Sequence, residues 1–227
     1  MSDLCSDVLN FVESRDLVRN SSRTATPLLL VGHSMGAKTA LRLALNHPGH
    51  VDGLVSLDAS PAAYSHSHSN VFAAMRAVNF DRVRAKSDVD AQLGVLLPSV
   101  ADRQFVIANN LRSSPSAALG GGAAAALQSS FAWRANVLAL EAHERHVLDW
   151  DVPDHVRYDG PALFIGGGQS SRLTEPRYRA RVPMHFPRAR VEMVADAGHF
   201  PHASHAAVCA RSIADFIARD VLGWHNR

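Results

Sequence analysis

The chain lacks the features that mark several large classes of protein. Its 227 residues include only two cysteines, Cys5 and Cys209, which lie far apart in the sequence. Two cysteines do not make the disulfide framework of a small secreted domain, so a reducing compartment is the simpler expectation. The first residues also lack the cationic start and the apolar segment of a signal peptide. We therefore expect an intracellular protein, and the sequence does not distinguish a mitochondrial location from a cytoplasmic one.

Long apolar runs and clusters of one charge are missing as well. The longest uninterrupted apolar stretches are about as long as a β-strand, so no membrane span is expected. The 23 basic and 21 acidic residues are interspersed, and no basic stripe indicates a nucleic-acid partner. The composition, 47% hydrophobic and 19% charged, is typical of one large globular domain or of a domain with an inserted lid. Nothing in it indicates an oligomeric state.

A pentapeptide of the form G-x-S-x-G is the most informative feature that is present. Gly32-His33-Ser34-Met35-Gly36 follows an apolar run at residues 28–31 and precedes a helix-forming segment. At such a strand-to-helix junction the motif forms a nucleophile elbow, a sharp turn that holds the serine hydroxyl exposed. We expect Ser34 to be the nucleophile, and a side chain at Gly32 or Gly36 to crowd the turn. The alternative is a glycine-rich turn that holds an ordinary serine.

Apolar spacing predicts how the flanking segments fold. Short apolar runs between turn residues predict strands buried on both faces, and a spacing of 3.6 residues predicts helices. The strand, helix and strand around Ser34 form the βαβ unit of a parallel sheet. Strands are expected at residues 28–31, 53–57, 162–165 and 191–194, and helices at residues 2–17, 38–45 and 206–220.

The middle of the chain has a different character. Residues 67–150 show helical spacing and no clear strand, which predicts a helical insertion. Within it, residues 113–130 include three consecutive glycines and an alanine run, a composition typical of a low-complexity loop. We expect an α/β core formed by residues 1–60 and 158–227, and a helical lid formed by residues 61–157.

A nucleophilic serine needs a base within hydrogen-bond reach, because its hydroxyl is a poor nucleophile at neutral pH. Among the 13 histidines, His199 is the best placed, since it lies between the last expected strand and the last expected helix. Catalytic groups gather at the carboxyl end of a parallel sheet. His199 also fits the chain order nucleophile, acid, histidine that accompanies such an elbow. His33 is better suited to packing and hydrogen bonding than to acting as the base.

The acid that would orient this histidine has two main candidate positions. The common one is the loop after the third expected strand, which holds no carboxylate before Glu175. The other is the end of the second expected strand, which runs directly into Asp58. That strand lies next to the elbow strand, so its carboxyl end would bring Asp58 beside Ser34, and we favour Asp58 over Glu175. Asp149 and Asp151 are less favoured, and the alternative role of Asp58 is to cap a turn.

No metal or cofactor is expected. Histidines recur every third residue at His199, His202 and His205, but a carboxylate–histidine pattern such as H-E-x-x-H is absent from the sequence. The sequence also contains no G-x-G-x-x-G motif and no P-loop. The residues therefore favour chemistry carried by side chains alone.

Several stretches together resemble one known group of enzymes. They are the elbow with its helix, Asp58-x-Ser60-Pro61, Ala74-Met75-Arg76-Ala77, Phe131-x-Trp133-Arg134-x-Asn136 and Ala197-Gly198-His199. With these motifs the chain resembles the α/β-hydrolases grouped with abhydrolase domain-containing protein 11 and its small bacterial esterase relatives. The resemblance implies an α/β-hydrolase fold with a helical lid, and esterase or thioesterase-type hydrolysis. In some of these relatives the acid follows the strand after the elbow helix and a serine lies in the later loop, which matches Asp58 and Ser170 here.

The resemblance breaks down at the start of the chain. Enzymes of this group have four further strands and a helix before the elbow, and one of the loops there carries half of the oxyanion hole. Here the elbow serine is residue 34, which leaves no room for these elements. The expectation is an N-terminally truncated chain whose elbow strand forms an exposed, wholly apolar sheet edge, a liability for aggregation.

Two functions are compatible with these residues. In the first, Ser34 attacks the carbonyl of a small acyl ester or thioester, His199 transfers the proton and Asp58 holds the imidazole. The backbone N–H of Met35 supplies one oxyanion donor, and the missing N-terminal part is expected to impair activity. In the second, a non-catalytic hydrolase-like fragment binds acyl ligands or a partner chain. A different reaction on the same fold, such as perhydrolysis or C–C bond cleavage, is a further alternative.

Overall fold

The computed structural model describes residues 2–15, 17, 27–113 and 131–223. The chain divides into two compact units, one formed by Met1–Tyr64 with Leu148–Arg227 and the other by Ser65–Val147. The first unit contains a parallel sheet and the second is mainly helical. The helical unit is therefore shorter at both ends than the expected lid at residues 61–157, and its action as a lid stays a prediction. Most of the expected low-complexity loop, residues 114–130, lies outside the described residues.

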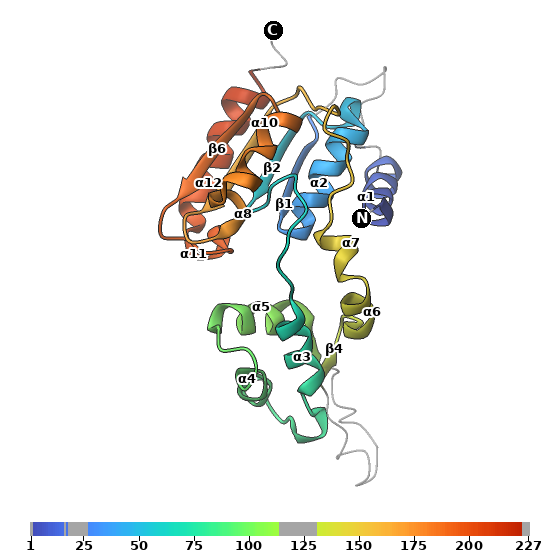
Figure 1. The fold of residues 1–227 in the computed structure, drawn as a ribbon, viewed down its shortest axis with the longest axis vertical. Coiled ribbons are helices and arrows are strands. Elements are labelled where there is room, and N and C mark those ends of the chain that lie inside the picture. The colour runs from blue at the N-terminus through green and yellow to red at the C-terminus, as the bar shows by residue number, and fades with distance from the viewer. Residues whose placement is uncertain (1, 16, 18–26, 114–130, 224–227) are drawn as a thin grey trace. The chain divides into compact units, whose positions relative to one another are not determined.

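The sheet of the first unit has four parallel strands in the order β1-β2-β5-β6, coloured from blue to orange in Figure 1. The four strands expected from the sequence are confirmed: β1, β5 and β6 each extend two residues further at one end, and β1 begins one residue later than expected. All of β2 and β5 is buried, as expected for strands covered on both faces. Their bounds are Leu29–His33 for β1, Gly53–Leu57 for β2, Ala162–Gly167 for β5 and Ala189–Val194 for β6.

The register of the sheet decides where loops meet. The last residue of β1, His33, pairs with Leu57 of β2, and Leu57 pairs with Ile165 of β5. The carboxyl ends of these parallel strands therefore lie along one edge of the sheet. The residues that follow each strand, Ser34 after β1 and Asp58 after β2, emerge there side by side.

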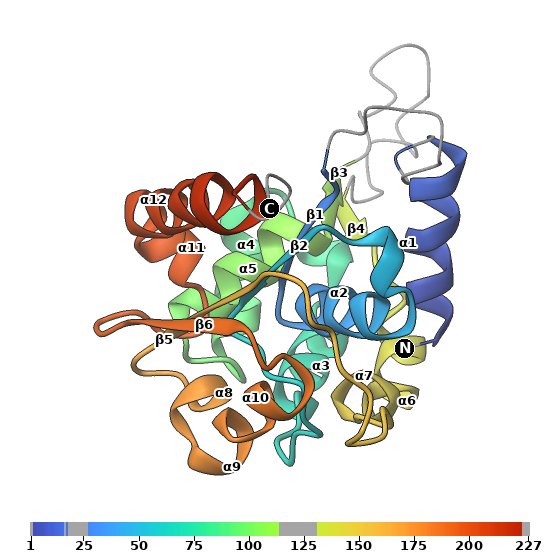
Figure 2. The same cartoon turned by 90° about the horizontal axis from the view of Figure 1, so that it is seen from above.

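Helices cover both faces of this sheet, as Figure 2 shows for α2, α8 and α10 on one side and α12 on the other. Alternate residues of β2 point to opposite faces: Leu54 packs in a core with Leu41 of α2, and Val55 packs in a second core with Phe216 of α12. The bounds are Ser2–Ser14 for α1, Met35–Asn46 for α2, Ser171–Thr174 for α8, Pro176–Arg179 for α9, Arg181–His185 for α10, Pro201–Ser204 for α11 and Ala206–Phe216 for α12, with a π-helical turn at Ile217–Val221. Cys5 and Cys209 lie in α1 and α12, and both are buried free thiols.

The helical unit has its own apolar core. Met75, Leu93, Val106 and Val137 belong to it, and each comes from a different helix. The helices are α3 at Ser69–Ala77, α4 at Lys86–Gly94, α5 at Val100–Asn110, α6 at Val137–Ala142 and α7 at Glu144–Leu148. Among the residues that the structure describes, no helix in either unit is both long and apolar enough to cross a membrane.

The expectation that this middle region has no strand is wrong. A short antiparallel pair, β3 at Leu111–Ser113 and β4 at Phe131–Trp133, lies between α5 and α6. Three-residue strands are too short to show an alternating pattern, so the sequence gives no periodic signal for them. Trp133 ties this pair to α3, since its indole N–H donates a 2.8 Å hydrogen bond to the carbonyl of Met75.

Candidate active site

Ser34 occupies the sharp turn between β1 and α2. Its backbone has φ 52° and ψ −115°, a left-handed conformation that is unfavourable for a residue other than glycine. The turn is held by backbone bonds on both sides, because the Ser34 N–H donates to Leu57 at 3.1 Å and the Lys38 N–H donates to Ser34 at 3.0 Å. This is the geometry of a nucleophile elbow, in which neighbouring structure over-determines a strained serine.

The two glycines of the motif differ in how much space they have. A Cβ added at Gly32 would overlap the carbonyl of Gly36, so the turn cannot close with a side chain there. A Cβ added at Gly36 would meet no heavy atom within 4 Å. The expectation that a side chain at Gly36 crowds the turn is therefore wrong: that glycine's Cβ direction faces open space.

A chain of two hydrogen bonds joins Ser34 to Asp58 through His199. The distance from His199 Nε2 to Ser34 Oγ is 3.0 Å, and the distance from His199 Nδ1 to Asp58 Oδ2 is 2.6 Å. An ionised carboxylate can only accept, so Nδ1 carries the proton and the Nε2 of a neutral imidazole is free to accept from the serine hydroxyl. This arrangement is able to remove a proton from Ser34 and to stabilise the imidazolium that forms.

Asp58 is fully buried and has three donors. Besides His199 Nδ1, the Gly167 N–H donates to Oδ1 at 2.9 Å and the Ser170 hydroxyl donates to Oδ2 at 2.5 Å. Burying a carboxylate is costly unless it is hydrogen-bonded, and these donors supply that compensation. The backbone of Asp58 is also in the left-handed region, with φ 49°. It is a second strained non-glycine residue at the carboxyl ends of the strands.

The loops after β5 and β6 approach each other unusually closely. A Cβ at Gly167 would overlap the carbonyl of Gly198, and the Gln169 N–H donates to the carbonyl of Ala197 at 2.9 Å. The glycine run at the end of β5 therefore lets the loop with Ser170 pack directly on the loop with His199. This contact brings the acid's donors and the histidine to one place.

The other acid candidates lie elsewhere. Glu175 accepts a hydrogen bond from Arg177 Nε at 2.6 Å, Asp149 accepts from the Trp150 N–H at 2.8 Å, and Asp151 forms an ion pair with Arg42. Within the described part of the chain, the carboxylate in contact with His199 belongs to Asp58. The structure thus brings together Ser34, His199, Asp58 and Ser170, and it does not bring Glu175 to them.

Two further candidates flank the serine in sequence. His33 contacts the loop that holds His199, with 2.7 Å between its Nε2 and the His199 carbonyl oxygen. Burial is the main cause that lowers the pKa of His33 to about 4, so this ring is neutral and unsuited to hold a proton at pH 7. Met35 is the first residue of α2, where the backbone N–H has no acceptor within the helix.

Lys38, which the sequence reading did not select, is buried beside this site. It lies one turn after Ser34 on α2 with a 2% exposed fraction. Its Nζ donates to the carbonyl of Leu148 at 2.7 Å and lies 4.7 Å from the centre of the Tyr64 ring. The Tyr64 N–H donates to the same carbonyl at 2.9 Å. A lysine four residues after the nucleophile, one turn along the helix and beside the expected elbow, was the available signal.

Burial lowers the pKa of Lys38 to about 7, the largest cause being removal of the ammonium from water. The neighbouring cations Arg42 and Arg172 lower the pKa further, whereas the carboxylates Asp149 and Asp151 raise it. Lys38 therefore changes its charge near neutral pH at the point where the two connections to the helical unit leave the sheet unit.

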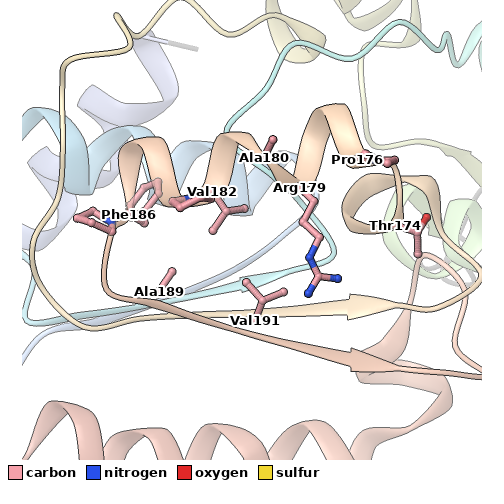
Figure 3. A pocket seen from close by; sticks show the side chains of 10 residues that line it. Thr174, Pro176, Arg179, Ala180, Val182, Phe186, Ala189 and Val191 are labelled. Carbon is pink, nitrogen blue, oxygen red and sulfur yellow. The ribbon is translucent and has the colours of Figure 1, made fainter.

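A separate groove lies on the sheet unit (Figure 3). Its volume is about 520 Å³, and it runs between the helices α9 and α10 and the strand β6. Figure 3 shows the Arg179 side chain reaching from the helix toward the strand that carries Val191. Ser34, Asp58 and His199 are not among its lining residues, so it is no part of this site. Among the described residues, no group of three or more potential ligands is arranged to hold a metal ion.

Comparison with known proteins gives one family and a consistent set of relatives. Residues 24–206 match the family model described as alpha/beta hydrolase fold. The chain is 33% identical over 198 residues to the sn-1-specific diacylglycerol lipase ABHD11 of Mus musculus, covering 85% of this chain and 59% of that protein. It is 29% identical over 189 residues to the esterase YbfF of Escherichia coli strain K12, covering 82% of this chain and 66% of that protein. The chain thus spans less than two thirds of the length of these relatives.

Solved structures show the same fold. A marine microorganism esterase superimposes with a TM-score of 0.78 at 21% sequence identity, covering 95% of this chain and 76% of that one. An E-2-(acetamidomethylene)succinate hydrolase superimposes with a TM-score of 0.65 at 17% identity, covering 94% and 72%. At these identities the likeness establishes the arrangement of strands and helices and says nothing of the substrate.

Proposed function

This chain belongs to the α/β hydrolase fold family, and from that premise we propose that it is a serine acyl hydrolase acting on carboxylic ester or thioester bonds. The observation that carries the proposal is the hydrogen-bonded chain from Ser34 through His199 to Asp58. The names of the relatives, a diacylglycerol lipase and an esterase, support ester bonds as the substrate class.

In the proposed reaction Ser34 Oγ attacks the acyl carbonyl while His199 Nε2 accepts the serine proton. The tetrahedral intermediate collapses to an acyl-serine when His199 gives that proton to the departing alcohol or thiol. Water then attacks the acyl-serine with His199 again as the base, and a carboxylic acid leaves. Asp58 keeps the imidazole in the Nδ1–H tautomer throughout and stabilises its cationic form.

The oxyanion of each tetrahedral intermediate needs donors of its own. We assign one of them to the Met35 N–H at the start of α2, where the helix dipole also favours negative charge. A site that works with one donor where two are usual loses roughly 10²–10³ in kcat. Because we assign a single donor to this site, we propose that the chain turns over esters slowly.

Labelling with a fluorophosphonate probe tests the nucleophile independently of the substrate. The wild-type chain should be labelled at Ser34, and Ser34→Ala should abolish both the labelling and the hydrolysis of a chromogenic short-chain ester. The control is Ser14→Ala, since Ser14 lies on α1 and is exposed. Undiminished hydrolysis in Ser34→Ala contradicts the proposal. A folded wild-type chain without labelling favours the non-catalytic alternative, a protein that binds acyl ligands or a partner.

A further inference from the structure

The side chain of His33 makes contacts that the proposed reaction does not use. His33 is the last residue of β1 and directly precedes Ser34. Its ring packs against His199 and Phe200 of the loop after β6 and against His202 of α11, with centroid distances of 4.7 Å, 5.2 Å and 4.4 Å respectively. The strand of the nucleophile thus contacts the loop of the base directly.

The hydrogen bond between His33 and His199 has a defined direction. The His199 carbonyl oxygen can only accept, so the proton of the neutral His33 ring lies on Nε2 and is donated across 2.7 Å. Burial keeps the ring neutral, because it lowers the pKa of His33 to about 4. The facing titratable groups are His199, His202 and Asp58. His33 is therefore a fixed donor over the pH range in which a histidine base works.

The His199 carbonyl has little other support. Ala197 on one side donates to Val194, and Phe200 on the other side accepts the Ala203 N–H at 3.0 Å. Among the backbone bonds of the described residues, none uses the carbonyl of His199 itself. The Nε2–H of His33 is thus the group that satisfies this carbonyl and fixes the orientation of the peptide.

We propose that His33 is a positioning residue that holds the backbone of His199 so that its imidazole stays in reach of Ser34. The proposal rests on the proposed function of Ser34 and His199. Asp58 fixes the imidazole at Nδ1, and His33 fixes the peptide that carries it. The two restraints act on opposite ends of one residue, which sets both the distance and the angle from Nε2 to Ser34 Oγ.

Loss of this restraint should slow the chemical step. A misplacement of about 1 Å between reacting groups can cost roughly 10²-fold in rate. Binding of a small ester should change little, because the bond joins two parts of the protein. We therefore expect the effect in kcat and in the rate of fluorophosphonate labelling, with KM nearly unchanged.

The donor can be tested with substitutions of matched length. Glutamine carries an N–H donor close to where Nε2 of histidine lies, and methionine has the same length without a donor. We expect His33→Met to lower kcat by roughly 10–10²-fold and His33→Gln to recover most of that loss. His33→Phe keeps a ring without a donor and should resemble His33→Met. The matched controls are His205→Gln and His205→Met, because His205 lies between α11 and α12 and its ring is bonded to Ser204.

A spectroscopic readout separates this proposal from the proposed function. The proton on His199 Nδ1, bonded to Asp58, gives a downfield NMR signal whether or not the chain hydrolyses esters. We expect the signal in the wild type and in His33→Gln, and its shift or broadening in His33→Met at unchanged melting temperature. If Ser34 is not labelled but these NMR changes are present, the proposed hydrolase function is refuted and the positioning role of His33 stands. The role of the donor is overturned if His33→Gln and His33→Met have equal kcat and equal NMR signals. This holds whether both variants match the wild type or both are impaired.

Discussion

Asp58 has no access to solvent, and its carboxylate accepts hydrogen bonds from a backbone N–H, a hydroxyl and an imidazole. Replacing it with asparagine keeps the size but favours the wrong imidazole tautomer, because an amide can donate to Nδ1. We expect Asp58→Asn to lower kcat by about 10⁴-fold, as for the orienting acid of a serine protease. Steady-state ester hydrolysis measures it.

The matched control for this change is Glu175→Gln. Glu175 pairs with Arg177 near the surface, so its loss should leave kcat within about twofold of the wild type, a surface ion pair being worth little. A larger loss of kcat in Glu175→Gln than in Asp58→Asn means that the acid has been assigned to the wrong carboxylate.

The glycines of the elbow give a second prediction for single residues. Gly32→Ala should prevent correct folding or destabilise the chain severely, because the new methyl group overlaps the Gly36 carbonyl. Gly36→Ala should leave the free energy of unfolding unchanged or raise it by about 0.5–1 kcal/mol, since alanine is the better residue in a helix. Urea unfolding of both variants measures the difference, and equal destabilisation would falsify this account of the turn.

Some site residues could be predicted from sequence context and others could not. Ser34 stands in a motif, and Asp58 and His199 each follow a strand, so topology alone brings them to one edge of the sheet. The role of Lys38 depends on contacts with Leu148, more than a hundred positions away in sequence. A hydrogen bond of that range depends on the complete fold and leaves no local pattern.

At the scale of elements, α2 is tied to both segments that connect the two units. The carbonyl of Leu148 accepts hydrogen bonds from the Lys38 ammonium and from the Tyr64 N–H. The first segment of the sheet unit ends at Tyr64, and its second segment begins at Leu148. The Tyr64 ring is close to two cationic groups, with Lys38 Nζ 4.7 Å and the Arg172 guanidinium carbon 4.8 Å from its centre. The helix of the nucleophile therefore anchors both connections.

The depressed pKa of Lys38 predicts how this anchor responds to pH. Its pKa is about 7 in the folded chain and ordinarily 10.5, so between these values the unfolded chain holds one more proton than the folded chain. Folding stability from this group is lowest below pH 7 and rises by about 1.4 kcal/mol per pH unit above it. Relative to Lys38→Met, the wild type should gain unfolding free energy from pH 7 to pH 9.

The control for that experiment is the only other lysine in the sequence, Lys86, which is exposed at the start of α4. Lys86→Met should show the same pH dependence as the wild type in parallel urea titrations. If the difference in unfolding free energy between the wild type and Lys38→Met is constant from pH 6 to pH 9, the Lys38 ammonium does not lose its proton in this range.

The strand β1 forms one edge of the described sheet, and Val31 on it is 50% exposed. An apolar edge strand with unpaired backbone groups favours pairing with other chains. Val31→Lys should therefore lower aggregation, measured by light scattering and gel filtration at several concentrations. Val208→Lys on α12 replaces a similarly exposed apolar residue away from the edge. If both variants lower aggregation equally, the cause is the added charge in general and not the exposed edge strand.

The strands of this sheet could be predicted because each is a short apolar run between turns, and β2 agrees with its expected bounds at both ends. The pair β3 and β4 could not, because three residues carry no period and their pairing joins residues about twenty positions apart. The boundaries of the helical unit also shifted inward from 61–157 to Ser65–Val147. Residues 149–157 look like an extension of the insertion in sequence, but Trp150 and Val152 pack in the core of the sheet unit.

At the scale of the whole molecule, each of the two units has a core of its own. Val89, Leu93 and Val106 are buried in the helical unit, and the sheet unit buries other residues on the two faces of its strands. Compact units with separate cores can fold independently unless a large apolar interface couples them. The chain should therefore unfold in two transitions, the helical unit and the sheet unit melting at different denaturant concentrations.

Tryptophan fluorescence can follow the two units separately. Trp133 lies in the helical unit with its indole bonded to Met75, and Trp150 is buried in the sheet unit. In a Trp224→Phe background, Trp133→Phe leaves a reporter of the sheet unit and Trp150→Phe leaves a reporter of the helical unit. We expect their urea midpoints to differ, with circular dichroism showing both steps. Coincident transitions for both reporters and for circular dichroism mean that the units unfold as one cooperative body, since agreement between probes is the test of two-state behaviour.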